Sequence, residues 1–343
     1  VGIFAGGSRL LEWMAERAAG VAFLRPTPPL ALVVAVMALL AGGVVASGRA
    51  RGRPRAVLFA GAAALFAFLA LRAGPRGPAR GFSLEALDVG QGDALLLRWR
   101  DRAVLVDGGG PFDREARDFG RTHVLPKLLD RGVTDLDAVL LTHPHPDHAL
   151  GLFTILDELP VGALWRSAGD DEGDFQKDLG AAASRRGVPV RVLSAGAAVR
   201  WRDARFAVLH AGGPLRKKDG INNQSVVARF ERDGRSALLT GDAGAAAEAE
   251  ILRTPALARS DVLKVGHHGS RGSTTPEFLE AVSPRAALVS CGRENRFGHP
   301  APETLANLAA RGIRVFRTDL DSDVGFELLP KATRLTRRDV PFP

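Results

Sequence analysis

The pattern of apolar and polar residues divides the chain into two parts. Near the start, residues 30–47 and 56–71 are apolar runs without a charged side chain. A membrane-spanning helix needs about 20 apolar residues, so we expect transmembrane helices at 30–47 and, if Arg72 reaches toward the membrane surface, at 56–72. The alternative is a buried helical hairpin in a soluble protein. Residues 1–29 carry apolar residues at helical spacing, which predicts an amphipathic helix at the end of a membrane region.

After a Gly- and Pro-rich linker at 73–81, the pattern changes to short apolar runs broken by Gly and Asp turns. The predicted strands are Phe82–Val89, Ala94–Trp99, Ala103–Val106, Ala138–Thr142, Phe206–His210, Ser225–Phe230, Ala237–Thr240, Val262–Val265, Ala286–Ser290 and Val315–Thr318. Helical patterns lie near 116–131, 175–186, 245–253, 276–282 and 302–311. Strands with interspersed helices predict an α/β or α+β domain with two sheets over 82–332, followed by a tail at 333–343.

Charge is distributed unevenly between the two parts. The first eighty residues hold ten arginines and two glutamates, which leaves 36 of the 46 basic and 36 of the 38 acidic side chains for the rest. The net charge of +8 therefore belongs to the N-terminal part. The part from residue 81 onward is neutral, so the basic isoelectric point does not indicate a nucleic-acid-binding domain. Two local basic clusters lie at residues 185–186 and 216–218. Each could be a solvated surface or a contact for a phosphodiester.

The loop between the two apolar runs contains four arginines, at positions 49, 51, 53 and 55. The positive-inside rule predicts that this loop is cytoplasmic, which would send the large domain to the outer side of the membrane. Three arginines also follow the second run, so the bias is small. The chain begins with Val1, and we expect it to be part of a longer protein. Cys291 is the only cysteine, which excludes an intrachain disulfide, and its apolar neighbours predict a core position.

The most informative stretch follows the predicted strand 138–142. It places His143, His145, Asp147 and His148 within six residues, although the chain has only eight histidines. Two histidines separated by one residue can project from the same side of an extended segment toward one metal ion. Asp147 and His148, beyond the bend imposed by two prolines, can face a second ion. Imidazole and carboxylate ligands suit zinc, manganese or iron; the alternative is a solvated His-rich loop.

Two further strands end in potential ligands. The strand 237–240 runs into Gly241 and Asp242, and a carboxylate there could bridge two metals. The strand 262–265 runs into His267 and His268. Together with the histidine-rich loop, these make three groups of ligands at strand ends.

These motifs resemble the metallo-β-lactamase fold, a four-layer αβ/βα sandwich. More narrowly, the segments LDVGQGDA (87–94), VLVDGG (104–109), NNQSVV (222–227), LTGD (239–242), KVGHHGS (264–270) and FGHP (297–300) resemble the C-terminal domain of ComEC-type DNA-uptake channels. The resemblance runs from about 82 to 330, and the apolar runs resemble the end of that family's transmembrane region. It implies a competence protein of the bacterial inner membrane with several spans.

The resemblance also implies roles for individual residues. His143 and His145 would hold one metal, Asp147 and His148 the other, with Asp242 bridging and His267 or His268 completing the second site. Two divalent ions, Zn or Mn, would be the cofactors. Asp107 would orient a ligand histidine. Further residues are expected beside the metals or the substrate: Asp88, Asp93, Asn223, Ser225, Asn295 and His299.

One position departs from the pattern. Lactamase-fold enzymes usually place a third histidine for the first metal just before a strand, whereas this chain has Asn222 and Asn223 there. His210, at the end of another strand, is a possible substitute, although a structural histidine fits this position equally well. The first metal is therefore expected to be loosely held or to bind with substrate.

Two cations can activate a water molecule for in-line attack on a phosphodiester. Asp147 or Asp242 could accept the proton from that water, and Lys264, Asn295 or His299 could hold the phosphate or the leaving oxygen. The metal residues alone would permit hydrolysis at phosphorus or at a carbonyl. The resemblance implies DNA as the substrate, and with it we expect a membrane-tethered nuclease that degrades one strand of incoming DNA. Its partners would be DNA, the membrane, other parts of the uptake channel and a second copy of the chain. The alternatives are a hydrolase of another phosphoester and a non-catalytic domain that gates a channel.

Overall fold

The computed structural model describes residues 77–111, 118–168, 175–212, 220–255 and 257–337. The predicted membrane segments at 30–47 and 56–72 and the amphipathic stretch at 1–29 lie outside these residues. So does the basic cluster at 216–218. Within the described ranges, no helix is both long enough and apolar enough to cross a membrane.

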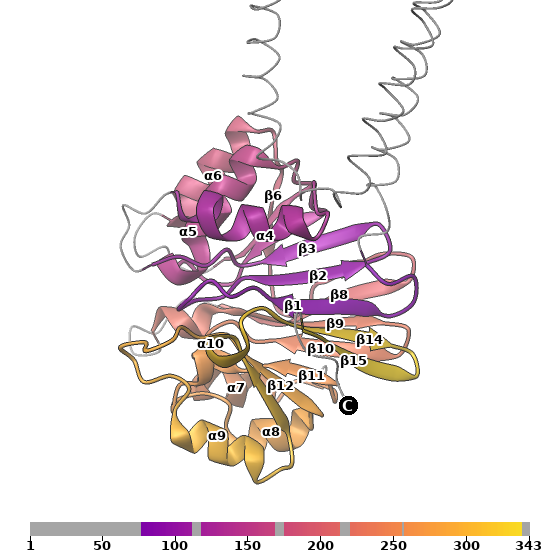
Figure 1. Cartoon of the computed structure of the whole chain (residues 1–343), viewed down its shortest axis with the longest axis vertical. Helices are drawn as coiled ribbons and strands as arrows, with labels where there is room; N and C mark the ends of the chain where they lie inside the picture. The colour runs from indigo at the N-terminus through magenta and orange to yellow at the C-terminus, as the bar shows by residue number, and fades with distance from the viewer. Residues whose placement is uncertain (1–76, 112–117, 169–174, 213–219, 256, 338–343) are drawn as a thin grey trace, which may run out of the picture. The chain divides into compact units, whose positions relative to one another are not determined.

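Two β-sheets form the centre of the domain (Figure 1). The first has eight strands in the order β15-β14-β1-β2-β3-β4-β5-β6. Its strands are β1 (Phe82–Ala86), β2 (Leu95–Trp99), β3 (Arg102–Val106), β4 (Ala138–Leu141), β5 (Leu164–Ser167), β6 (Val190–Leu193), β14 (Val324–Leu329) and β15 (Ala332–Arg337). The second has seven strands in the order β13-β12-β11-β10-β9-β8-β7. Its strands are β7 (Ala198–Arg200), β8 (Ala204–Ala211), β9 (Val226–Arg232), β10 (Arg235–Leu239), β11 (Val262–Lys264), β12 (Ala286–Val289) and β13 (Arg314–Arg317).

Helices cover the outer face of each sheet, which gives four layers (Figure 1). On the side of the first sheet are α5 (Pro146–Glu158) and α6 (Phe175–Arg185), together with a π-helical segment at Gly120–Val124 that leads into α4 (Leu125–Asp130). On the side of the second sheet are α7 (Ala245–Ile251), α8 (Pro276–Val282) and α9 (Pro302–Ala309), with the short α10 (Thr318–Asp321) nearby. The expected α/β sandwich with two sheets is confirmed.

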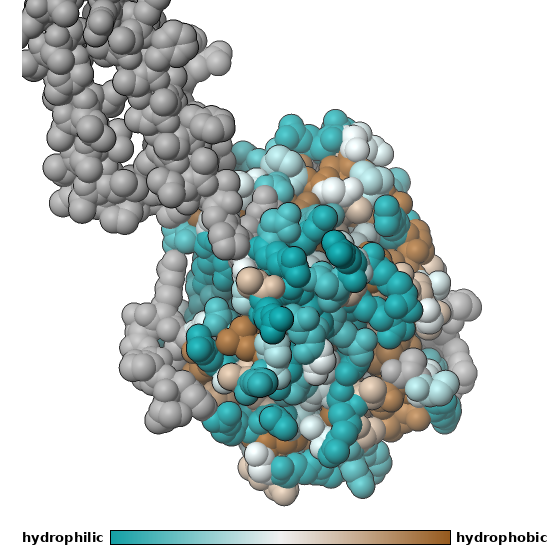
Figure 2. Space-filling view, turned by 90° about the vertical axis from the view of Figure 1, so that its right-hand side faces the viewer, coloured by the Kyte–Doolittle hydropathy of each residue, from teal (hydrophilic) through white to brown (hydrophobic). Residues whose placement is uncertain are grey.

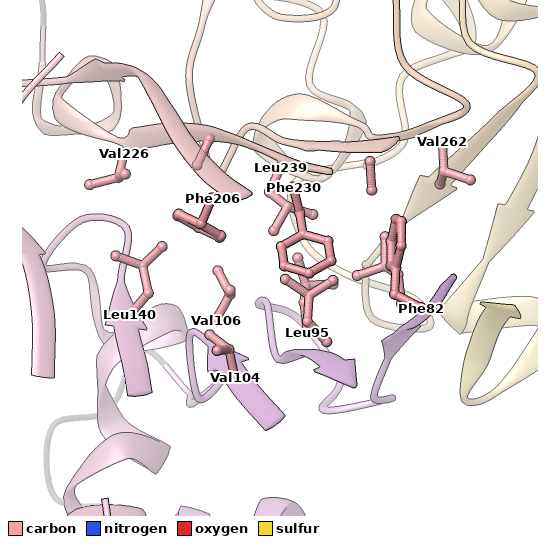
Figure 3. Packing of buried hydrophobic residues seen from close by; sticks show 14 of the residues in the cluster. Phe82, Leu95, Val104, Val106, Leu140, Phe206, Val226, Phe230, Leu239 and Val262 are labelled. Carbon is pink, nitrogen blue, oxygen red and sulfur yellow. The ribbon is translucent and has the colours of Figure 1, made fainter. Parts of the chain in front are cut away.

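The inner faces of the sheets pack against each other and form the main core. Alternate residues of each strand face this layer, so Phe82 and Leu95 of the first sheet meet Phe206 and Phe230 of the second (Figure 3). The rings of Phe82 and Phe230 pack edge to face, with centroids 4.8 Å apart. A second core lies between the second sheet and α7, α8 and α9, and it contains the buried Cys291 as the sequence predicts.

All ten predicted strands are present, with ends that differ by a few residues. The sequence patterns missed β5, β6, β7, β14 and β15, because these strands are short, polar on one face or lie at a sheet edge. They also missed α5, the longest described helix, because two prolines, Pro144 and Pro146, indicate a bend in the chain rather than the start of a helix. Pro146 occupies the first turn of α5, where its missing N–H costs no helical hydrogen bond.

The strand directions determine where a site can form. In the first sheet β3, β4, β5 and β6 are parallel neighbours, and in the second sheet β10, β11, β12 and β13 are parallel. The loops that follow the carboxyl ends of parallel strands share one edge of a sheet. The loops after β3 and β4 therefore meet those after β10 and β11 at one end of the sandwich.

Candidate metal centre

Asp107 follows β3 and anchors the histidine-rich loop. Its carboxylate is fully buried and accepts hydrogen bonds from the backbone N–H of Thr142 (2.8 Å) and the hydroxyl of Thr142 (2.7 Å). The same carboxylate accepts a bond from Nδ1 of His148 at 2.8 Å. A histidine that donates from Nδ1 presents Nε2 as the free lone pair. Asp107 therefore orients His148 for binding, as the resemblance implies.

The loop after β4 presents the first pair of histidines. His143 is fully buried, whereas His145 is partly exposed, and their rings lie 4.7 Å apart. Asp147 and His148 follow in the first turn of α5, and both are buried. The helix thus turns these two side chains away from His145, which gives the loop two distinct groups of ligands.

Asp242 lies at the centre of the cluster. Its backbone N–H donates to the hydroxyl of Ser225 at 3.0 Å, which fixes the turn after β10. Its Oδ1 lies 3.2 Å from Nε2 of His148 and 3.4 Å from Nε2 of His268. Its Oδ2 lies 3.7 Å from Nε2 of both His143 and His267. Each carboxylate oxygen therefore faces two imidazoles.

His267 and His268 reach Asp242 from a tight turn after β11. Both have left-handed backbone conformations, with φ of 47° and 53°. Non-glycine residues seldom adopt this conformation, and such strain concentrates at functional sites. Nδ1 of His268 donates to the carbonyl of Ser290 at 2.9 Å, so its Nε2 points to Asp147 Oδ2 at 3.4 Å. His267 is more open, and Asn222 Nδ2 lies 3.1 Å from its Nε2.

Two groups of side chains that share Asp242 could hold metal ions, and a third group without it consists of Asp93, Asp107 and His148. Of the two that share Asp242, one consists of Asp147, His148, Asp242 and His268, and the other of His143, His145 and Asp242; in each group the potential ligand atoms lie within 4.8 Å of one another. Buried polar atoms normally find a hydrogen-bond partner. Five buried atoms of the two groups that share Asp242 make no hydrogen bond with any described residue: Nε2 of His143, His148 and His268, and Oδ1 of Asp147 and Asp242. Their chemistry and placement fit divalent cations.

Electrostatic effects oppose one another within the cluster. Burial would lower the pKa of His148, but Asp242 and Asp107 raise it well above its ordinary value. The pKa of His268 is likewise raised to about 10 by Asp242 and Asp93, against the effect of burial. Burial and the neighbouring His148 lower the pKa of His143 well below its usual value. The carboxylates thus create a site that favours positive charge, while His143 remains a neutral ligand.

Lys264 and Asp93 form a fully buried ion pair behind His268. Nζ of Lys264 lies 2.6 Å from Oδ2 of Asp93 and donates to the carbonyl of Val265 at 2.9 Å. Oδ1 of Asp93 lies 3.4 Å from Nδ1 of His268. Lysine lowers the pKa of Asp93 to about 2, although burial acts in the opposite direction. This geometry makes Lys264 a support for His268; its predicted contact with substrate stays a prediction.

The remaining predicted residues either lie beside the cluster or form hydrogen bonds within their own loops. Ser225 contacts the cluster through Asp242, and the ring of His299 lies 5.4 Å from that of His267. Burial and then His267 lower the pKa of His299 to about 4. By contrast, Asn295 bonds to the backbone of its own loop at Gly292 and His299. The carboxylate of Asp88 accepts from the N–H of Gly90 in an exposed turn.

Neither proposed substitute for the third histidine joins the cluster. Oδ1 of Asn223 accepts from the N–H groups of Gly244 (3.1 Å) and Ala247 (3.3 Å) at the start of α7. The ring of His210 lies between the carbonyl of Ser225 and the carboxylate of Glu250. Both residues have structural contacts instead.

Thr142 and Ser290 support the site, and the sequence reasoning did not identify them. Thr142 orients Asp107 and Ser290 orients His268. Each directly follows a buried apolar strand, and that position next to the ligand loops is the signal that could have found them.

A pocket of about 580 Å³ opens beside the cluster. His145, Asp242 and His267 lie on its wall, together with the segments 220–223, 244–246, Ser270 and Gly272. No Arg or Lys is among the described residues on this wall. The group of His143, His145 and Asp242 is therefore the one that borders this opening, whereas the group around His268 is buried.

The comparisons with known proteins agree with this geometry. The family model described as Metallo-beta-lactamase superfamily matches residues 87–293, and the chain belongs to this superfamily of metal-dependent hydrolases. Within the superfamily the chain is similar to competence proteins of the ComEC type. It is 34% identical over 255 residues to ComE operon protein 3 of Bacillus subtilis, covering 71% of this chain and 32% of that protein. It is 32% identical over 323 residues to Competence protein ComA of Neisseria gonorrhoeae, covering 93% of this chain and 42% of that protein. Recombination protein 2 of Haemophilus influenzae is 32% identical over 219 residues, covering 64% of this chain and 25% of that protein. The chain thus spans less than half the length of these relatives.

Proposed function

We propose that the domain is a metal-dependent nuclease that degrades one strand of DNA during uptake by a competence channel. The observation that carries the proposal is the placement of four imidazoles around the two oxygens of Asp242. Competence proteins among the relatives supply the expectation that the phosphodiester is DNA.

Two divalent cations, Zn or Mn, would lower the pKa of a water molecule and neutralise charge on phosphoryl oxygens. Asp147, His148, Asp242 and His268 would hold one of them. His143, His145 and Asp242 would hold the other, and we add His267 to this group because it faces the same oxygen of Asp242 as His143. His267 would thereby take the place of the histidine that Asn222 and Asn223 replace.

The chain's own residues would orient the reactants. Asp147 Oδ1, which makes no hydrogen bond within the described chain, is available to accept a proton from an attacking water. The pocket beside His145 and His267 can admit a phosphodiester. Because its described wall offers no cationic side chain, cations would supply the positive charge that the phosphate requires.

The test is cleavage of linear DNA, labelled on each strand, by the full chain in detergent with Mn²⁺ or Zn²⁺. We expect one strand to be degraded and Asp147→Ala to abolish degradation. Asp157→Ala is the matched control, since Asp157 is an exposed aspartate of the same helix. Cleavage of small phosphodiesters without cleavage of DNA would favour another phosphoester substrate. Bound metal without hydrolysis of either would favour a non-catalytic gating role.

We further propose that residues 30–47 and 56–72 span the bacterial inner membrane and place the hydrolase domain on its outer side. The four arginines of the loop between the apolar runs support this orientation. An alkaline phosphatase fused after residue 343 should be active, because that enzyme folds only outside the cytoplasm. An inactive fusion that is expressed in full would reverse the orientation.

A further inference from the structure

An arginine-rich groove lies at the end of the sandwich opposite the metal cluster. It has a volume of about 510 Å³ and lies at the two hairpin turns that join β7 to β8 and β9 to β10. Six arginines and three carboxylates line it: Arg200, Arg202, Arg205, Arg229, Arg232, Arg235, Asp203, Glu231 and Asp233. Hydrophilic residues cover most of this side of the domain (Figure 2). We call this feature the arginine groove.

The carboxylates leave the arginine groove with an excess of positive charge. Asp203 pairs with both Arg100 and Arg232, and Glu231 pairs with both Arg205 and Arg229. Burial lowers the pKa of Arg229, and repulsion from Arg205 adds to this effect against the attraction of Asp261. An anion bound in the groove would relieve that repulsion.

Arg200 and Arg202 flank the hairpin tip between β7 and β8. Both side chains are exposed, and neither has an ion-pair partner among the described residues. Between them, Trp201 packs edge to face on Trp99 with centroids 4.9 Å apart. The partly buried indole of Trp201 packs against the main core and holds the tip in place, so the two exposed guanidinium groups have a fixed base. Guanidinium groups bind phosphate oxygens in a bidentate manner.

A second basic cavity continues this surface across the starts of the next strands. It encloses about 240 Å³ and includes Arg235 of the arginine groove together with Arg285, Arg314 and Lys331, against Asp261. The basic face therefore extends from the hairpin tip to the turn between β14 and β15.

The chain enters the domain beside the arginine groove. The buried side chain of Arg232 donates hydrogen bonds to the carbonyls of Pro78, Ala79 and Gly81. The predicted membrane span at 56–72 ends only five peptide steps before Gly77. At about 3.6 Å per residue, these steps extend to roughly 18 Å. If that span is in the bilayer, the linker is short enough to keep the groove within reach of the lipid headgroups.

We propose that the arginine groove binds the phosphate headgroups of anionic phospholipids in the membrane that anchors the chain. The proposal rests on the membrane attachment proposed above and is independent of the nuclease activity. DNA phosphates would match the same charge, but β10 separates the groove from the cluster. A strand of five residues is about 17 Å long, so a phosphate in the groove lies away from Asp242. Lipid binding here would direct the metal cluster away from the bilayer, toward incoming substrate.

The test is hydrogen–deuterium exchange of the full chain reconstituted in vesicles of phosphatidylcholine, with or without phosphatidylglycerol. We expect the amides of 198–205 to exchange more slowly when phosphatidylglycerol is present, and high salt to remove this protection. The double variant Arg200→Gln and Arg202→Gln should lose the protection, whereas Arg200→Lys with Arg202→Lys should keep most of it. The matched control, Arg271→Gln with Arg296→Gln, removes two exposed arginines near the metal cluster and should leave the protection unchanged.

Three results would overturn the proposal. The first is equal exchange of 198–205 in both kinds of vesicle. The second is protection that requires added oligonucleotide and is indifferent to phosphatidylglycerol, which would make the groove a nucleic-acid site. The third is a chain that fails to float with either vesicle, which would remove the attachment itself while leaving DNA cleavage by the cluster open to its own test.

Discussion

Oδ2 of Asp107 accepts a hydrogen bond from Nδ1 of His148 at 2.8 Å, in a pocket where neither side chain is exposed to solvent. A carboxylate behind a ligand histidine fixes the ring and increases its basicity, and removing it typically weakens metal affinity 10–100-fold. We expect Asp107→Asn to lower the affinity for Zn²⁺ by about this factor. Titration against a competing chelator measures the change. Asp88→Asn should bind like the native chain, because Asp88 bonds to Gly90 in its own turn and belongs to none of the ligand groups.

Substitutions of the adjacent residues His267 and His268 should each affect the binding of a different metal ion. If each serves a different ion, His267→Ala and His268→Ala will each lose one of two bound metals, and the double variant will lose both. Metal per chain, measured by mass spectrometry after gel filtration, gives the counts. His210→Ala provides the control, because its ring contacts Ser225 and Glu250 outside both ligand groups. A His267→Ala variant with undiminished metal content would remove His267 from the set of ligands.

The buried pair of Lys264 and Asp93 should be important for stability. Removing one partner leaves an uncompensated buried charge, which costs about 3–5 kcal/mol. We expect Lys264→Ala to lower the free energy of unfolding by this amount and to reduce metal content through His268. In Lys264→Met with Asp93→Leu, both charges are gone, so stability should recover while metal content stays low. If the single variant instead unfolds like the native chain and loses only activity, a direct role of Lys264 on substrate is supported.

Glu248 joins α7 to the start of α8. Its carboxylate, almost fully buried, accepts from the N–H groups of Thr274 and Thr275. Each unsatisfied buried donor costs roughly 1–3 kcal/mol, so Glu248→Ala should lower the midpoint of thermal unfolding. Glu250→Ala is the control on the same helix, with a side chain 60% exposed, and should change stability by about 0.5 kcal/mol or less.

Glu248 also predicts a pH dependence. Burial raises its pKa above the ordinary value of 4.5, although backbone hydrogen bonds from Thr275 and Thr274 oppose the shift. The folded state therefore keeps the proton longer than the unfolded state. The stability from this group is full below the unfolded pKa and is lost as the pH rises through the folded pKa. The amide of Glu248→Gln cannot titrate. The stability of this variant relative to the native chain should therefore increase as the pH rises through this window. A constant difference between the two midpoints from pH 4 to 7 would contradict this account.

The sequence predicted the two-sheet fold and the groups of ligands because both depend on local patterns. Apolar runs that end in His143 or Asp242 identify strand ends, and parallel strands bring such ends together. The helix α5 was missed because Pro146 is equally compatible with a bend and with the first turn of a helix. The sequence also could not predict that His267 and His268 lie in different surroundings. This difference depends on the left-handed backbone conformation of both residues, which no sequence pattern indicates. The capping role of Asn223 similarly depends on the distant start of α7.

The metal cluster draws on both sheets, and this has a consequence for how the domain is made. Asp107 and the loop 143–148 are translated well before Asp242 and His268, which belong to the other half of the sandwich. A nascent chain that has only its first half folded lacks Asp242, which both ligand groups around the centre share. Under the proposed function, hydrolysis would therefore begin only after Asp242 and His268 have been synthesised and the two sheets have packed together, so a chain terminated before Asp242 would be inactive.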